Sequence, residues 1–310
     1  MSYELRDDET LGEGMRRIIC QQVEGAIEAS IGERNGKGSP VHETRKRLKK
    51  ARAAVRMISD EVLQAQLQRE RRCLRKVARL ISEIRDAEVR LQTVKELREL
   101  SPGTKNRNFR ETEELLAFEL DSFLAAFSDW QEDARTKLTR ARDRIAKWPL
   151  DDLSCKTIRQ AAQLSYKRGR QALRRARKTP APENFHSFRK EAKQLWYQLR
   201  ILRPLHPVIL KELADDLKTI GQHLGHAHDL AFLADRLKTN PGSRRAKRGQ
   251  RALGGLIDSR QKELQRMAAA LGERFYAQRA RDFGRRLSEY FAEWEIAKVR
   301  CSKVAETAQA

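Results

Sequence analysis

The pattern HxxRKxxK occurs twice in the sequence. Its two copies consist of His42, Arg45, Lys46 and Lys49, and of His186, Arg189, Lys190 and Lys193. Residues three, four and seven positions apart share one face of a helix, so each copy would present a histidine and three cations on one side. Lys acts on phosphate as a point charge and Arg can grip two oxygens at once. The chemistry indicated is the binding of an extended anion.

Both rows of cations continue along their predicted helices. Arg52 and Arg56 extend the first row, and Tyr197 and Arg200 extend the second. Seven basic residues and no acidic one lie from Arg45 to Arg56. Like charges one helical turn apart repel by about 0.2–0.5 kcal/mol per pair, so we expect a bound anion to offset the repulsion. A rise of about 5.4 Å per turn lets such rows follow a linear phosphate polymer.

The two histidines allow two interpretations. His42 and His186 fall in or near the first turn of their predicted helices, where free N–H groups and the helix dipole favour anions. Beside a phosphate, such a histidine would be held protonated. Alternatively, both are structural histidines that donate to a backbone carbonyl. The sequence leaves both interpretations open.

A further cationic segment precedes the second histidine. Tyr166, Arg170 and Arg174 share a helical face, and we include them among the binding residues. Their counterpart in the first half is Arg16 or Arg17, of which we select Arg17. The basic residues of segment 244–251 adjoin a predicted turn and are interpreted as solvated surface.

The elements that position these residues are helices. Apolar residues recur with helical periodicity over about 15–30, 40–59, 63–83, 85–100, 110–147, 153–178, 185–203, 208–224, 229–237 and 244–300, and no segment reads as a strand. The predicted fold class is all-α. The histidine motifs repeat at an offset of 144, and the segments around Asp86 and Asp229 repeat at 143. We therefore predict an internal duplication, with helical bundles at 1–149 and 150–300 facing each other about a pseudo-two-fold axis and a flexible tail at 301–310.

Composition narrows the classes of function. The 310 residues include 65 Lys and Arg against 43 Asp and Glu, a formal net charge of +22, which predicts a polyanionic partner. Neither a membrane span nor a signal peptide is expected. The four dispersed cysteines indicate reduced thiols and a cytoplasmic protein. We find no phosphate-loop, hydrolase or metal-ligand motif, and expect no enzyme, cofactor or metal site. His223, His226, His228 and Asp229 are weighed as metal ligands and set aside, because His228 stands where the first repeat has Arg85.

The segments VHETRKRLKKARAAVRMI, FHSFRKEAKQLWYQLRILRPL, LISEIRDAEVRL and LGHAHDLAFL resemble the CHAD family, the conserved histidine α-helical domain. The resemblance extends over about residues 3–300. It implies two four-helix bundles around a basic central channel, inorganic polyphosphate as the ligand, and localisation to polyphosphate granules. It carries both HxxRKxxK copies over as binding residues, together with Tyr166, Arg170 and Tyr197. The second copy departs from the first in having Glu191 and Gln194 where the first has Arg47 and Lys50, so the first wall is expected to bind more strongly.

Two alternatives to a non-catalytic polyphosphate-binding protein stay open. A nucleic-acid-binding protein could use the same cations, although aromatic residues, which would stack on bases, make up only 6% of the chain. An enzyme acting on polyphosphate or nucleotides would need metal ligands that the sequence does not supply.

Overall fold

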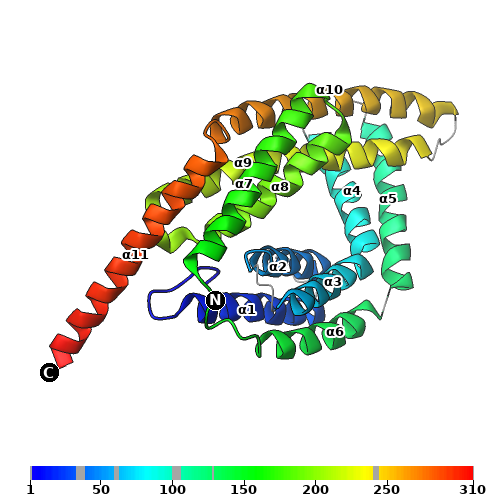
Figure 1. The fold of residues 1–310 in the computed structure, drawn as a ribbon. Coiled ribbons are helices and arrows are strands. Elements are labelled where there is room, and N and C mark those ends of the chain that lie inside the picture. The colour runs from blue at the N-terminus through cyan, green and yellow to red at the C-terminus, as the bar shows by residue number, and fades with distance from the viewer. Residues whose placement is uncertain are drawn as a thin grey trace.

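The computed structural model describes residues 2–32, 39–58, 63–99, 106–127, 129–239 and 244–309, and the side chains of 106–108, 239, 244–252 and 300–309 lie outside that description. Within these ranges the chain forms helices and no strand (Figure 1), which confirms the predicted all-α class. The α-helices are α1 Leu11–Ile31, α2 Pro40–Val55, α3 Gln64–Leu80, α4 Ser82–Glu99, α5 Asn106–Ala126, α6 Trp130–Ile145, α7 Cys155–Lys178, α8 Pro182–Ile201, α9 Pro207–Thr239, α10 Arg244–Phe275 and α11 Ala280–Gln309, with a short 3₁₀ helix at Arg203–Leu205.

Some helix boundaries differ from the predicted ones. The segments 208–224 and 229–237 were predicted as two helices, but α9 runs through both because only glycines, and no proline, interrupt them. The segment 110–147, predicted as one long helix or a pair of helices, is a pair, α5 and α6. Residues 301–309, predicted as a flexible tail, continue α11 as helix, since the sequence after Gly284 contains neither glycine nor proline.

The core lies between helices that pack in two groups. Helices α1, α2, α3 and α6 pack together, and α7 and α8 pack with α9, α10 and α11 (Figure 1). Large side chains such as Met15, Ile18, Leu48, Phe188 and Phe283 are fully buried in this core. A second apolar cluster joins α4 and α5 to α9 and α10; it comprises Val94, Leu97, Phe109, Leu116, Ala227, Leu230, Leu233, Leu253, Ile257 and Leu264.

The N-terminal segment ties the two groups together. The amide of Leu5 donates to the carbonyl of Ile201 at 3.1 Å, and the indole of Trp294 donates to Asp7 at 2.7 Å. Thr10 caps α1 through a reciprocal bond with Glu13, which fixes where the segment ends and the helix begins. Helix α2 of the first group also contacts α8 of the second, and α4 contacts α9. The contact of α2 with α8 matters for function, because these helices carry the two histidine motifs.

None of the helices in the described ranges combines the length and apolar composition that crossing a membrane requires.

Candidate functional site

Helix α2 carries the first row of cations on the face next to its core face. The hydroxyl of Ser39 accepts from the amide of His42 at 3.0 Å, and Pro40 occupies the first turn, so the helix starts as the sequence predicted. The buried face consists of Val41, Thr44, Leu48, Ala51, Ala53, Ala54 and Val55. Because that face is held in the core, the long cationic side chains lie on the remaining sides, one of which faces α8.

Helix α8 carries the second row and crosses α2. Pro182 begins the helix, and the buried face consists of Phe185, Phe188, Ala192, Gln194, Leu195, Tyr197, Gln198, Leu199 and Ile201. Gln194 joins the two helices: its amide donates to the carbonyl of Ala53 at 3.3 Å, and its oxygen accepts from Arg56 at 2.9 Å. The crossing therefore fixes the distance between the two cationic rows.

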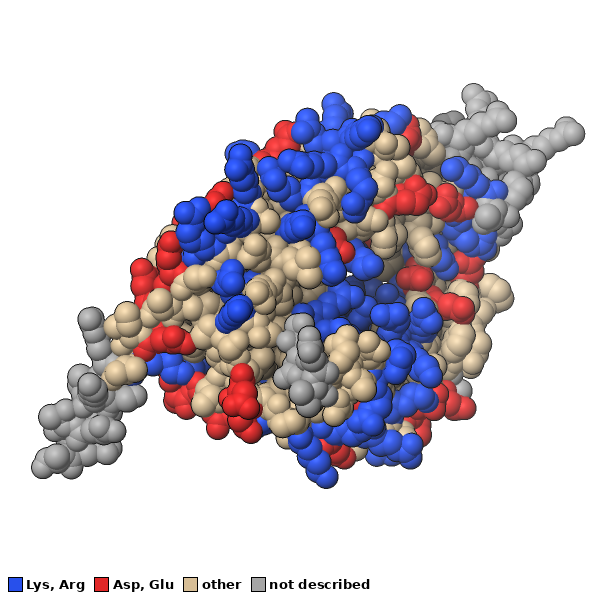
Figure 2. Space-filling view, viewed as in Figure 1, with Lys and Arg blue, Asp and Glu red and all other residues tan. Residues whose placement is uncertain are grey.

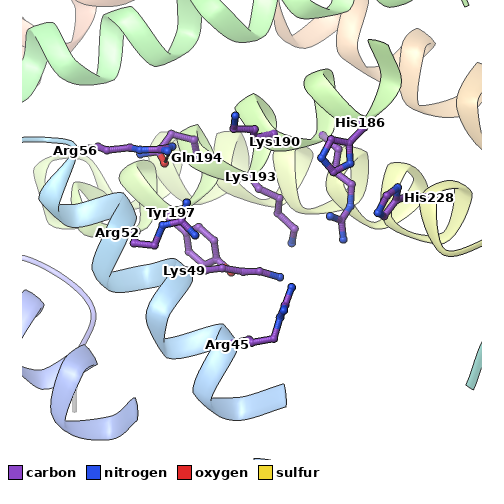
Figure 3. Close-up of a pocket in the computed structure, with 11 residues that line it drawn as sticks. Arg45, Lys49, Arg52, Arg56, His186, Lys190, Lys193, Gln194, Tyr197 and His228 are labelled. Carbon is purple, nitrogen blue, oxygen red and sulfur yellow. Dashed lines mark hydrogen bonds between the residues drawn. The ribbon is translucent and has the colours of Figure 1, made fainter. Parts of the chain in front are cut away.

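A pocket of about 330 Å³ lies between these rows (Figure 3). Seven of its eleven lining residues are Lys or Arg, and no lining residue is acidic. The ends of Arg45, Lys49 and Lys193 point toward one another from the two helices. The lining residues are Arg45, Lys49, Arg52 and Arg56 of α2, His186, Arg189, Lys190, Lys193, Gln194 and Tyr197 of α8, and His228 of α9.

The cations of the pocket make few polar contacts with other side chains. Among the described residues, none of the seven forms an ion pair, whereas arginines on other helices, such as Arg85, Arg142 and Arg144, do. Arg45 donates only to the carbonyl of Ala78, at 3.3 Å, and the Nε of Arg189 is buried without a hydrogen-bond partner in the described part of the chain. Buried donors are rarely left unpaired in proteins, so this arrangement is suited to receive an anion.

Two glycines of α9 make room for the second row. A Cβ on Gly221 would lie 3.1 Å from Cε of Lys193, and a Cβ on Gly225 would lie 3.5 Å from the guanidinium of Arg189. These glycines are one turn apart, as are the two cations that lie against them. Their missing side chains allow Lys193 and Arg189 to lie along the α9 backbone and still reach the pocket.

The crowding of cations changes their protonation. The pKa of Lys49 is lowered to about 7, chiefly by burial and then by Arg189 and Arg45. Burial likewise lowers the pKa of Lys193 to about 8, with Arg189 and Arg200 acting in the same direction. The side chain of Lys49 is nevertheless accessible from the pocket. Without an anion, Lys49 is therefore only partly charged at neutral pH, and a bound anion would favour its protonation.

Burial favours the neutral form of three histidines in or beside the pocket. Burial lowers the pKa of His228 to about 4, and burial also lowers the pKa of His42 and His186, in each case with nearby cations adding to the effect. The rings of His186 and His228 lie 4.7 Å apart at one end of the pocket. Protonation of His42 and His186 beside a bound phosphate stays a prediction for the ligand-bound state.

Three carboxylates lie near the cations without lining the pocket. Burial raises the pKa of Asp86 and Asp229, while Arg45 acts most strongly against this at Asp86 and Arg189 at Asp229. Both aspartates lie inside helices, so they are electrostatic partners of arginine and not caps. Glu191 raises the pKa of Arg56, after the larger opposing effect of burial. The field of the pocket remains positive because these acids are fewer than the cations.

Eight of the fourteen residues predicted from sequence line this pocket. They are Arg45, Lys49, Arg52, His186, Arg189, Lys190, Lys193 and Tyr197. His42 and Lys46 lie beside it on α2, where Lys46 pairs with Glu43 at 3.1 Å. The structure places the remaining four, Arg17, Tyr166, Arg170 and Arg174, elsewhere.

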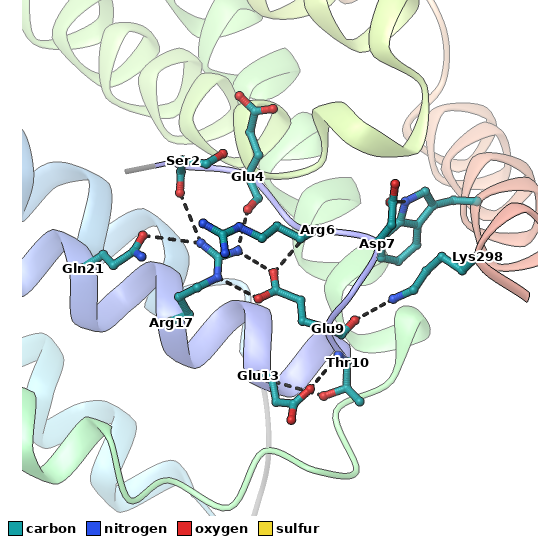
Figure 4. A network of polar contacts seen from close by, with 11 residues as sticks. Ser2, Glu4, Arg6, Asp7, Glu9, Thr10, Glu13, Arg17, Gln21 and Lys298 are labelled. Carbon is teal, nitrogen blue, oxygen red and sulfur yellow. Dashed lines mark hydrogen bonds and ion pairs between the residues drawn. The ribbon is translucent and has the colours of Figure 1, made fainter. Parts of the chain in front are cut away.

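Arg17 belongs to a network at the N-terminus (Figure 4). Its guanidinium donates to Glu9 at 2.7 and 2.5 Å and to the carbonyl of Glu4 at 2.8 Å. These hydrogen bonds use the guanidinium N–H groups that could otherwise bind a phosphate. Arg17 therefore fixes the chain segment that precedes α1.

Tyr166 and Arg170 join α7 to the end of α10. Tyr166 is fully buried, stacks on Phe283 at 4.4 Å and donates to the carbonyl of Phe275 at 3.1 Å. Arg170 donates to the carbonyl of Tyr276 at 3.0 Å. Arg174 is exposed on α7. The sequence predicted that Tyr166 and Arg170 share a helical face, but not that the end of α10 covers that face.

Three lining residues were not among those predicted. The sequence places Arg56 in the extension of the first row of cations, and Gln194 among the positions at which the two repeats differ. His228 was considered only as a metal ligand. Among the described residues, no group of three His, Cys, Asp or Glu side chains is arranged to hold a metal ion.

A sequence profile of the CHAD domain matches residues 19–238, which is more than two thirds of the chain. The matched range includes both histidine motifs and every residue that lines the pocket. Among curated proteins, none matches the chain.

Proposed function

The chain belongs to the CHAD domain family, and from this premise and the pocket we propose that it binds inorganic polyphosphate without transforming it. The observation that carries the proposal is the set of seven cations which line one pocket and, in the described structure, form no ion pair; the Nε of Arg189 is also buried without a hydrogen-bond partner there. A polymer with one negative charge per repeating unit would supply the missing partners along both rows. Arg45, Arg52 and Arg189 would grip oxygens in pairs, and Lys49 and Lys193 would act as adjustable point charges.

The arrangement of α2 and α8 supports the finer parts of the proposal. Each helix follows an antiparallel partner, α1 or α7, begins near a proline and presents HxxRKxxK to the other. We interpret this as the internal duplication predicted from the sequence, with the pocket as the central part of a basic channel. An extended polyphosphate chain would then lie between the two helices and contact both repeats.

Several further features belong to the same proposal. We assign the protein no catalytic step, because the residues around the pocket include no nucleophile with an adjacent base and no arrangement of carboxylates for magnesium among the described residues. Binding to polyphosphate granules in the cytoplasm follows from the family and from the choice of ligand. The protein would act there by attaching to the polymer.

One observation favours nucleic acid as a second candidate ligand. The indole of Trp196 lies beside the pocket, with Nζ of Lys193 4.0 Å and Cζ of Arg200 5.2 Å from the ring centre. An aromatic ring flanked by cations is the arrangement on which single-stranded bases stack. Here, however, the cations cover the ring, and a base would have to displace them. Polyphosphate needs no such displacement and is therefore the favoured ligand.

The test is a pair of variants that remove two positive charges each. In K49Q/K193Q both changes lie in the pocket, whereas in K95Q/K156Q both lie on exposed surfaces of α4 and α7. Titration with long-chain polyphosphate at physiological salt should show at least about tenfold weaker binding for the pocket variant, from two charge-assisted contacts. The surface variant should bind like the wild type. Equal affinities of the two variants would contradict the assignment of the pocket.

A further inference from the structure

Positive charge continues beyond the pocket at the end marked by Arg56. Two arginines from other helices, Arg75 of α3 and Arg168 of α7, lie close enough to Arg56 to lower its pKa, although burial contributes most. Arg75 acts on Arg52 in the same way. Arg75 and Arg168 are both exposed. The cationic surface therefore leaves the pocket at this end and reaches solvent between α3 and α7.

The two flanks of α7 differ in what they contact. One flank packs against α10, where Arg170 donates to the carbonyl of Tyr276 and Arg177 pairs with Glu273. Arg168 and Arg175 lie on the opposite flank, are exposed, and within the described residues form no ion pair like that of Arg177. Seven residues of helix separate them, which is about 10.5 Å along the axis.

The free flank of α7 runs beside the pocket. Residues 179–181 join α7 directly to α8, so the two helices are antiparallel and packed together. Arg168 lies at the end of the pocket formed by Arg56. Arg175, nearer to the connection, lies toward the end of α8 that carries His186 and Lys190. Figure 2 shows Lys and Arg side chains both in the central hollow of this face and on the surface around it.

We propose that Arg168 and Arg175 of α7, with Arg75 of α3 beside them, form an outer binding row for the part of a long polyphosphate chain that leaves the pocket past Arg56. This inference rests on the proposed function. The pocket, at about 330 Å³, has the size of a small-molecule site and encloses only a short stretch of polymer. The phosphates next to that stretch emerge beside Arg56, where the outer row begins at Arg168, and the chain then turns back along α7 toward Arg175.

The outer row makes binding depend on chain length. A chain short enough to fit in the pocket uses only the inner cations, whereas a long chain uses both sets. Each additional phosphate contact releases counterions, so long chains should bind more tightly and with a steeper salt dependence than short ones. Removing two outer contacts should lower the log–log salt slope by about 1.4, if polyphosphate behaves like a single nucleic-acid strand.

The experiment compares two double variants of α7 with equal loss of charge. R168Q/R175Q removes the two α7 members of the outer row, and R174Q/K178Q removes two exposed cations from the solvent side of the same helix. Both variants and the wild type are titrated with tripolyphosphate and with long-chain polyphosphate over a range of salt. We expect R168Q/R175Q to bind the long chain about three- to tenfold more weakly and tripolyphosphate unchanged. The R174Q/K178Q variant should bind both ligands nearly as the wild type does.

The outcomes separate this inference from the function on which it rests. Suppose that the wild type binds long-chain polyphosphate and that both variants bind it equally weakly. Helix α7 then contributes only general positive charge, and the proposal of an outer row is wrong. If the wild type binds neither ligand, the proposed function fails as well. Circular dichroism before each titration shows whether the variants retain their helices, which exposed substitutions on one helix should leave intact.

Discussion

Binding of polyphosphate should take up a proton, because the pocket holds a lysine that is only half charged at neutral pH. The pKa of Lys49 is about 7 and that of Lys193 is about 8, both lowered by burial and then by neighbouring arginines. A polyanion placed between them favours the charged forms and raises both pKa values. Each lysine thus binds the ligand fully when protonated, and affinity is lost as pH rises through the pKa of the free protein.

The size of the effect follows from these pKa values. Lys49 is about 91% protonated at pH 6 and about 9% at pH 8, which is a tenfold change in affinity. Lys193 falls from nearly full to about half protonation, a further factor of about two. Solvent reaches Lys49 in the pocket and screens its interactions, so we expect about five- to twentyfold weaker binding at pH 8. Near pH 6, protonation of His186 and His228 on binding would add to the proton uptake.

Calorimetric titration in two buffers of different ionisation enthalpy measures the proton directly. At pH 7.5 the unprotonated fractions of Lys49 and Lys193 sum to about one, so one proton should enter per occupied pocket. The variant K49R keeps its charge throughout this range. Its proton uptake should fall to about 0.2, and its affinity should change only about twofold between pH 6 and 8. If wild-type binding takes up no proton, or if K49R takes up as many protons as the wild type, Lys49 is not the group that becomes protonated on binding.

Three other substitutions test individual assignments. E191Q removes the carboxylate beside Arg56 and should strengthen polyphosphate binding about two- to fivefold in a titration at physiological salt; unchanged or weaker binding would place Glu191 away from the ligand. Y166F removes hydroxyl bonds to two backbone carbonyls and should lower the free energy of unfolding by about 0.5–1.5 kcal/mol with no effect on binding, as measured by urea denaturation and titration. Loss of binding by a folded Y166F protein would restore Tyr166 to the site. R17Q breaks the pair with Glu9 and should cost about 1.5–3 kcal/mol of stability, again leaving affinity unchanged; a melting temperature equal to that of the wild type would contradict this role.

The sequence predicted the parts of the site that one helix can specify. The positions of Arg45, Lys49, Arg189 and Lys193 on a common face follow from helical spacing, and Ser39 marks where α2 starts. These features depend only on neighbouring residues, so they can be predicted without knowing the fold. The all-α class could be predicted for the same reason.

The predicted residues that lie outside the pocket, and the lining residue His228, depend on contacts between distant segments. Tyr166 shares a helical face with Arg170, but the chain that covers this face comes from residues more than 100 positions later. The guanidinium of Arg17 donates to Glu9. Glu9 precedes α1, so helical periodicity cannot place it relative to Arg17. His228 enters the pocket because α9 packs on α8, and its identity differs from the corresponding Arg85. Periodicity along one segment carries no information about such packing.

The central claim is that a shaped pocket recognises phosphate chains. Titration of the wild-type protein with long-chain polyphosphate, in competition with equal phosphate equivalents of single- and double-stranded DNA at physiological salt, tests it most directly. We predict a preference for polyphosphate of more than about tenfold, which corresponds to about 1.4 kcal/mol. Equal or better competition by DNA would contradict the claim, since the net charge of +22 would then act as a general attractor of polyanions.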